Sequence, residues 1–229
     1  GPVGAGASRV EPRQLGDALV RNQAAAVGGA VHGLVVDHDE LPVAGEPQVQ
    51  LHARRSCRQR SVKARERVLG RLAARVAVGL LDLGLKRRDI VLFQLPNVRE
   101  FIIVFFALQK IGVIPVMCLP HHRARELSYF AELTGANAYL FPQRFRNFDY
   151  LPMAREIQAR NPGLSHLLSL GAGSERGVSY LDSWIEEEPR VGDVARELGP
   201  HRPDPFEVAF MLLSGGTTGV PKLIPRTHV

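Results

Sequence analysis

Hydrophobic and polar positions along residues 76–229 follow two alternating periods, which predict strands and helices in turn. Short apolar runs closed by Pro, Gly or Asn are typical of buried strands, whereas apolar positions three or four apart indicate helices. Buried strands are expected at 89–95, 113–119, 138–141, 164–170 and 208–213. Helices are expected over 72–85, 98–110, 125–134, 151–160 and 181–188, with a proline-bearing loop over 189–205. This order predicts an α/β fold, a layered, mostly parallel sheet flanked by helices.

Residues 1–75 do not share this pattern. Ala, Gly, Val and Arg dominate them and periodicity is poor, so we divide the chain into an atypical region, 1–75, and a patterned region, 76–229. Residues 54–75 carry nine Lys or Arg against one acid, whereas 76–229 carry seventeen against sixteen. The net charge of +6 therefore comes from one short block, which also lacks aromatic residues on which bases could stack. We expect no nucleic acid partner.

The composition indicates a folded protein, because 45% hydrophobic residues are enough for a sizeable core. Two cysteines, Cys57 and Cys118, are too few for a disulfide scaffold, and we expect a reduced, cytoplasmic protein. Residues 101–120 are long enough to cross a bilayer, but Gln109 and Lys110 lie at their centre. A buried helix, a turn and a buried strand explain this stretch better, so we expect no membrane partner.

The strand expected at 208–213 leads into a segment rich in glycine and hydroxyl groups, with the sequence SGGTTGVPK over 214–222. Glycine allows the backbone to bend and to approach a ligand closely, and successive N–H groups can then converge on one anion. The hydroxyl groups add donors and Lys222 adds a positive charge, which suits a polyphosphate. The spacing differs from that of a Walker loop. Composition alone leaves a plain flexible hairpin loop as an equal alternative.

The string LSGGTTGVPK over 213–222 resembles the phosphate-binding signature of the adenylate-forming superfamily, which includes acyl- and aryl-CoA synthetases, nonribosomal adenylation domains and luciferases. Its continuation, LIPRTH over 223–228, is similar to a narrower branch, the stand-alone 2,3-dihydroxybenzoate–AMP and salicylate–AMP ligases of siderophore synthesis. The segments 91–97 and 119–130 are similar to that branch as well. The resemblance covers about 76–228 and implies part of the large N-terminal domain of the adenylate-forming fold.

This resemblance implies a two-step ligase that uses ATP and Mg²⁺. An aryl carboxylate attacks the α-phosphate, and the aryl-adenylate then passes its aryl group to the phosphopantetheine thiol of a carrier protein. Fixed donors aimed at the charge that develops on pyrophosphate lower the barrier. The implied cofactor-binding residues are Ser214, Gly215, Gly216, Thr217, Thr218, Gly219 and Lys222. Thr217 and Thr218 are expected to make side-chain contacts to the phosphates. For Lys222 the alternative to phosphate binding is a structural charge at the base of the loop.

Other candidate residues favour structural roles. His121 and His122 are adjacent, and neighbouring side chains of an extended segment point to opposite faces, so we expect a turn-forming or packing role rather than a metal site. Cys118 lies in an apolar run and is expected to be inert core. Trp184 is expected to anchor packing. His228 is expected to position backbone, since no Ser or Asp partner suggests a triad.

The chain also departs from the family pattern. The family's aryl-acid pocket, its adenine- and ribose-binding residues and the lysine that contacts the adenylate lie in later segments. We therefore expect an inactive fragment without catalytic or metal-ligating residues of its own. The family has an Arg-x-Thr-Tyr-x-Glu-Leu segment that residues 24–75 lack. We therefore expect that part of this region is translated out of frame, with a genuine insertion as the alternative. The functional alternatives are a non-catalytic nucleotide- or carrier-binding remnant and another acyl-CoA synthetase-like ligase.

Overall fold

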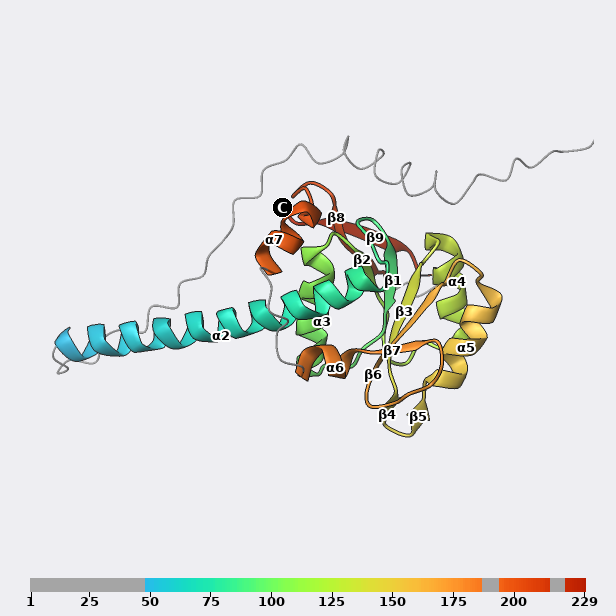
Figure 1. Ribbon diagram of the computed structural model, residues 1–229, viewed down its shortest axis with the longest axis horizontal. Coiled ribbons are helices and arrows are strands. Elements are labelled where there is room, and N and C mark those ends of the chain that lie inside the picture. The colour runs from blue at the N-terminus through green and yellow to red at the C-terminus, as the bar shows by residue number, and fades with distance from the viewer. Residues whose placement is uncertain (1–47, 187–193, 215–220) are drawn as a thin grey trace, which may run out of the picture.

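The computed structural model describes residues 48–186, 194–214 and 221–229, which are organised around a seven-stranded sheet (Figure 1). The strand order is β7-β6-β3-β1-β2-β8-β9, and all neighbours are parallel except β8 and β9. The strands of this sheet are β1 (Ile90–Phe93), β2 (Ile114–Met117), β3 (Ala138–Pro142), β6 (His166–Leu170), β7 (Val178–Tyr180), β8 (Val208–Leu213) and β9 (Leu223–Thr227). A small antiparallel ribbon pairs β4 (Arg144–Phe145) with β5 (Phe148–Asp149).

Helices cover both faces of the sheet, which makes three layers (Figure 1). One face carries α2 (Gln48–Asp82), α3 (Arg99–Lys110), α6 (Leu181–Glu186) and α7 (Val194–Leu198), and α2 packs against the other three. The opposite face carries α4 (Ala124–Thr134) and α5 (Leu151–Arg160), which pack against each other. This arrangement confirms the predicted α/β class with a mostly parallel sheet.

Most elements lie where the hydrophobic pattern predicts them. The helix at 151–160 and the strand at 208–213 have the expected bounds, and the other predicted strands, together with α3 and α4, begin and end within two residues. The expectation of a loop over 189–205 was wrong for part of that range, where α7 and a 3₁₀ turn, η1 (Gly199–His201), form. Strands β4, β5, β7 and β9 were not predicted, because polar residues interrupt their apolar pattern and each becomes stable only by pairing with a neighbour.

Helix α2 is 35 residues long, whereas the sequence predicted only its final turns. It crosses without a break the division that we placed after residue 75. Its residues are mainly strong helix formers without proline, so the helix forms although its hydrophobic pattern is weak. Its N-terminal half extends away from the sheet (Figure 1). The helix ends before Gly84, which has a φ of 100° that glycine adopts without strain.

Two hydrophobic clusters hold the layers together. The cluster on the α2 and α3 side includes Phe93, whose ring makes edge-to-face contacts with Phe101 at 4.9 Å and Phe105 at 6.5 Å between centroids. Trp184 of α6 packs against the same cluster and lies over Gly79 so closely that a Cβ there would be 2.7 Å from the indole ring. This contact confirms the packing role predicted for Trp184. The cluster on the other side buries one face of α4 and one face of α5.

The apolar stretch over 101–120 forms most of α3, a turn at Gly112 and β2, as predicted. Among the described residues, no helix has the length and hydropathy of a membrane span. Helix α3 is buried on most sides, as expected of a buried helix, but one stripe is open, because Ile102 and Phe106 are both 45% exposed. They open onto two apolar hollows of about 640 and 1120 Å³ that lie alongside α2 and α3.

This exposed apolar face is expected to bind a hydrophobic dye such as anilinonaphthalene sulfonate. The double variant Ile102→Gln/Phe106→Gln should reduce dye fluorescence at unchanged protein concentration, because each neutral polar side chain replaces apolar surface at a hollow without attracting the anionic dye. The matched control is Phe206→Gln, since Phe206 is 79% exposed and lines neither hollow. Equal dye fluorescence in the double variant and the wild type would contradict this assignment of the exposed face.

Candidate phosphate-binding site

The base of the predicted phosphate loop is a closed hairpin between β8 and β9. Leu213 and Leu223 are the last paired residues, and beyond them the Ser214 N–H donates to the Lys222 carbonyl oxygen at 2.8 Å. The Lys222 N–H in turn donates to Ser214 Oγ at 3.0 Å. This pair of hydrogen bonds fixes the two ends of the loop next to each other. Gly215, Gly216, Thr217, Thr218 and Gly219 lie outside the described residues, so their predicted contacts stay predictions.

The two described members of the predicted set have different surroundings. Ser214 accepts the Lys222 amide through its hydroxyl oxygen, which leaves the hydroxyl hydrogen available to a ligand. The Lys222 side chain is exposed, and no hydrogen bond or ion pair joins it to another described residue. Its ammonium group is therefore accessible to an anion, and its backbone, rather than its charge, closes the loop.

The loop base lies at the carboxyl edge of the parallel strands, where ligands bind in open α/β sheets. Strand β8 pairs in parallel with β2, with Met211 opposite Val116, so the end of β8 lies beside the end of β2. Strands β1 and β2 are neighbours, but α3 follows β1 on one face and α4 follows β2 on the other (Figure 1). In sheets with such a divergence of connections, ligands bind at the carboxyl edge beside it, and Ser214 follows β8, the strand next to β2, at this edge.

The histidine pair at this edge belongs to the turn between β2 and α4, as predicted. His122 Nδ1 accepts the Leu119 N–H at 3.1 Å, which closes the turn. Burial first, and then the charge of His121, lowers the pKa of His122, which favours the neutral ring that can accept this bond. Arg123 donates to the Pro120 carbonyl oxygen at 2.9 Å and lies 4.0 Å above the Phe148 ring. The described residues contain no group of three or more potential metal ligands.

Two further expectations agree with the structure. Cys118 is buried, and burial raises the pKa of its thiol far above the ordinary value, so the reactive thiolate is suppressed. The His228 N–H donates to the Pro205 carbonyl oxygen at 3.2 Å, which ties the end of β9 to the segment before β8. This bond is a backbone role, in line with the prediction for His228.

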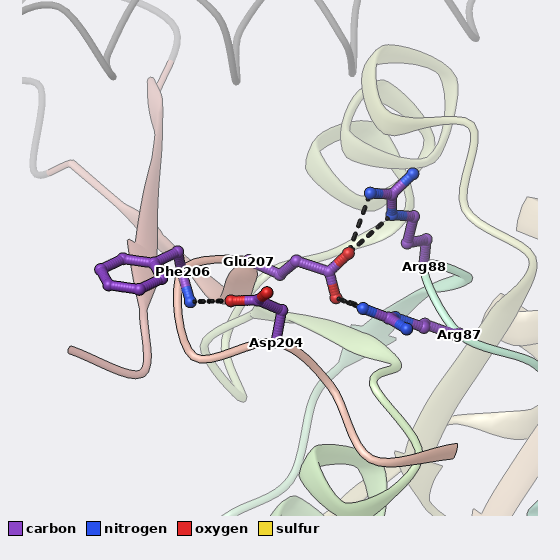
Figure 2. Close-up of polar contacts among 5 residues, drawn as sticks. All are labelled: Arg87, Arg88, Asp204, Phe206 and Glu207. Carbon is purple, nitrogen blue, oxygen red and sulfur yellow. Dashed lines mark hydrogen bonds and ion pairs between the residues drawn. The ribbon is translucent and has the colours of Figure 1, made fainter. Parts of the chain in front are cut away.

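The sequence analysis missed a carboxylate clamp at the other end of β8 (Figure 2). Glu207 Oε2 accepts from Arg87 Nε at 2.8 Å, and Oε1 accepts from Arg88 Nε and Nη2 at 3.1 and 2.9 Å. These arginines precede β1, so the clamp ties the starts of two strands together. At a rise of about 3.3 Å per residue, Glu207 lies roughly 23 Å from Ser214 and does not reach the loop. The one feature of the sequence that could have indicated this clamp is that charged residues stand directly before two strands.

The Glu207 clamp is expected to make stability depend on pH in the acid range. Burial raises the pKa of Glu207, but the bonds from Arg87 and Arg88 outweigh burial and hold this pKa below its ordinary value. A lowered folded-state pKa stabilises the protein above the unfolded pKa, and this stabilisation is lost as pH falls through the folded pKa. Glu207→Gln should therefore cost about 1–2 kcal/mol of unfolding free energy at pH 7, and less near pH 3.

Urea unfolding at several pH values measures this difference. The matched control is Glu156→Gln, because Glu156 makes only an exposed ion pair with Arg160, one helical turn away. Such pairs contribute at most about 1 kcal/mol. A destabilisation by Glu207→Gln that is the same at pH 3 and pH 7 would show that the carboxylate charge is not what stabilises the clamp.

The described geometry is that of an α/β sheet with a closed hairpin loop at its carboxyl edge, the class of fold that binds nucleotides there. A family model described as AMP-binding enzyme matches residues 66–229. The chain therefore belongs to the AMP-binding enzyme family.

Sequence relatives refine this likeness. The chain is 40% identical over 162 residues to the 2,3-dihydroxybenzoate-AMP ligase of Bacillus subtilis, covering 71% of this chain and 28% of the relative. It is 44% identical over 161 residues to the salicyl-AMP ligase / salicyl-S-ArCP synthetase of Mycobacterium tuberculosis, covering 70% and 27%. The chain thus spans a little over a quarter of the length of these relatives.

Solved structures agree with the sequence relatives. The apo structure of Mycobacterium smegmatis MbtA matches with a TM-score of 0.57 and 41% identity, over 70% of this chain and 28% of that one. The anthranilate CoA ligase AuaEII, solved in complex with anthranoyl-AMP, matches with a TM-score of 0.59 and 25% identity, over 70% and 29%.

Proposed function

We propose that this chain supplies the phosphate-binding part of an aryl-acid–AMP ligase. The observation that carries the proposal is the hairpin loop closed by Ser214 and Lys222 at the carboxyl edge, in a chain whose relatives are named as ligases of 2,3-dihydroxybenzoate and salicylate. The substrates are ATP and an aryl carboxylic acid, either 2,3-dihydroxybenzoate or salicylate. Siderophore biosynthesis is the proposed context, since one relative is named as vibriobactin-specific.

In this proposal the loop holds the β- and γ-phosphates while the aryl carboxylate attacks the α-phosphate. The backbone N–H groups of Gly215, Gly216 and Gly219 and the hydroxyls of Thr217 and Thr218 would donate to the charge that develops on pyrophosphate. Ser214 and Lys222 fix the two ends of the loop, and the Lys222 ammonium adds a positive charge. A Mg²⁺ ion bound to the ATP phosphates would neutralise more of that charge beside the Lys222 ammonium.

The second half-reaction passes the aryl group from the adenylate to a thiol. We propose the phosphopantetheine thiol of a carrier protein, because the name of one relative includes an S-ArCP synthetase activity. A second acceptor, coenzyme A, is favoured by relatives named as 2-hydroxy-7-methoxy-5-methyl-1-naphthoate–CoA ligase and salicylyl-CoA synthase. ATP as a substrate is consistent with a cytoplasmic location.

A chimera tests the proposed function. The 161 residues aligned with the M. tuberculosis salicyl-AMP ligase replace the matching stretch of that enzyme. We expect pyrophosphate–ATP exchange that depends on salicylate or 2,3-dihydroxybenzoate and not on acetoacetate. Transfer is then assayed with carrier protein and with coenzyme A separately. A folded chimera without exchange would mean that this chain is a non-catalytic remnant of the family.

A further inference from the structure

Gln94 is a buried amide at the carboxyl end of β1 that the proposed chemistry does not use. Its side chain is fully buried, with 0% exposure. Nε2 donates to the Leu119 carbonyl oxygen at 2.7 Å and to the His122 carbonyl oxygen at 3.1 Å, and Oε1 accepts from the Tyr139 hydroxyl. A buried amide is costly unless it is hydrogen-bonded, and this one has partners for both of its donors and for its acceptor.

Two of these bonds go to the turn between β2 and α4, residues 119–123, and the bond from Tyr139 of β3 orients the amide that makes them. The Pro120 carbonyl oxygen, which Gln94 does not reach, accepts from the Tyr150 hydroxyl at 2.8 Å. Three side chains, Gln94 at the end of β1, Tyr139 near the start of β3 and Tyr150 directly before α5, thus hold this turn, directly or through one another. Gln94 supplies buried bonds to the turn, in addition to the exposed bonds that His122 and Arg123 make within it.

The turn is mechanically connected to the base of the phosphate loop. Cys118, directly before the turn, donates its N–H to the Phe93 carbonyl oxygen at 2.9 Å, which keeps it in the ladder with β1. Leu213 and Leu223, the last pair before the loop, pack against the hydrophobic cluster that contains Cys118 and Phe130. Packed cores transmit strain, so this shared cluster is the physical link between the turn and the Ser214–Lys222 pair on which the inference depends.

We propose that Gln94 is a positioning residue for the phosphate loop. By holding the 119–123 turn in one place, its amide keeps the cluster under the loop base in one arrangement. This arrangement keeps Ser214 and Lys222 hydrogen-bonded and the loop ends at a fixed separation. The inference rests on the proposed function only for the identity of the loop's ligand. The coupling between Gln94 and the Ser214–Lys222 pair is a property of the chain without any ligand.

Amide hydrogen exchange in the 229-residue chain, followed by NMR, tests this inference. Gln94→Met keeps the volume and removes all three bonds. Exchange at the Ser214 and Lys222 amides should accelerate on the order of tenfold relative to the Leu168 amide in β6. The reason is that the hydrogen-bonded base of the loop opens locally more often when the turn is no longer held. Gln158→Met is the matched control, since Gln158 donates to the Leu164 carbonyl oxygen in the α5–β6 connection. It should leave the Ser214 and Lys222 amides unchanged.

Each outcome decides the inference. A folded Gln94→Met variant with unchanged exchange at Ser214 and Lys222 overturns it, whatever its overall stability. If Gln94→Met does not fold, Tyr139→Phe decides instead, because it removes one bond to Gln94 and should give a smaller acceleration at the same two amides. A MgATP titration of the chimera separates the two proposals. Failure of the folded chimera to bind MgATP counts against the proposed function, whereas the exchange pattern alone decides the role of Gln94.

Discussion

Replacing Thr217 and Thr218 by alanine is expected to lower kcat/KM for ATP by roughly tenfold to a hundredfold per residue in the chimera. Each hydroxyl is proposed to donate a charge-assisted hydrogen bond to pyrophosphate, and loss of such a bond costs about 1.5–3 kcal/mol. The glycine backbone of the loop stays intact in this double variant. Salicylate binding should change little, because the aryl pocket is expected in another segment of the family.

The control for the threonine variant is Thr134→Ala, which makes the same chemical change at the end of α4. Thr134 Oγ1 donates to the Phe130 carbonyl oxygen at 2.7 Å and lies away from the loop. Unchanged ATP kinetics in the double variant would mean that the loop is only a hairpin connector. Equal losses of ATP turnover and salicylate binding would mean that the substitutions disturb the fold.

A polypeptide of these 229 residues alone is expected to give no acid-dependent pyrophosphate–ATP exchange. It spans a little over a quarter of its ligase relatives, and the resemblance places the aryl-acid pocket and the adenylate-contacting lysine in other segments. Without these groups the carboxylate is neither bound nor oriented toward the α-phosphate, and orientation supplies much of the rate enhancement. The loss should therefore be complete within the assay background.

The rate of pyrophosphate–ATP exchange by the 229-residue chain is compared with that of the chimera in the same assay, with 2,3-dihydroxybenzoate and salicylate as the acids. Exchange by the 229-residue chain that clearly exceeds the heat-inactivated control would contradict it. That result would place an aryl-acid pocket within these residues, and the apolar hollows beside α2 and α3 would then be the first place to examine.

The parts of the fold that local pattern encodes could be predicted from the sequence. Strand β8 was predicted at its observed bounds because six apolar or small residues precede a glycine-rich segment. The end of the helix predicted over 125–134 agrees with α4, because the residue that follows, Gly135, adopts its φ of 64° without strain. The loop after β8 was identified from composition and resemblance together, and its described ends, Ser214 and Lys222, do close a hairpin.

The parts that depend on distant partners could not be predicted. The Glu207 clamp joins Glu207 to arginines that lie 119 and 120 positions away in the sequence. The residues around Glu207 do not indicate these partners. In the sequence, Gln94 is a single polar residue at the end of an apolar run. Its bonds to Leu119 and Tyr139 form only when the strands pair. The exposure of Ile102 and Phe106 was missed because an all-apolar helix does not reveal which face has a partner.

The most direct measurement of the central claim is a crystal structure of the chimera with MgATP. The account predicts that oxygens of the β- and γ-phosphates lie within about 3 Å of backbone N–H groups and threonine hydroxyls in the 214–222 loop, at the carboxyl edge of β8. Bound MgATP whose phosphates lie elsewhere, with the 214–222 loop making no contact to them, would contradict the account.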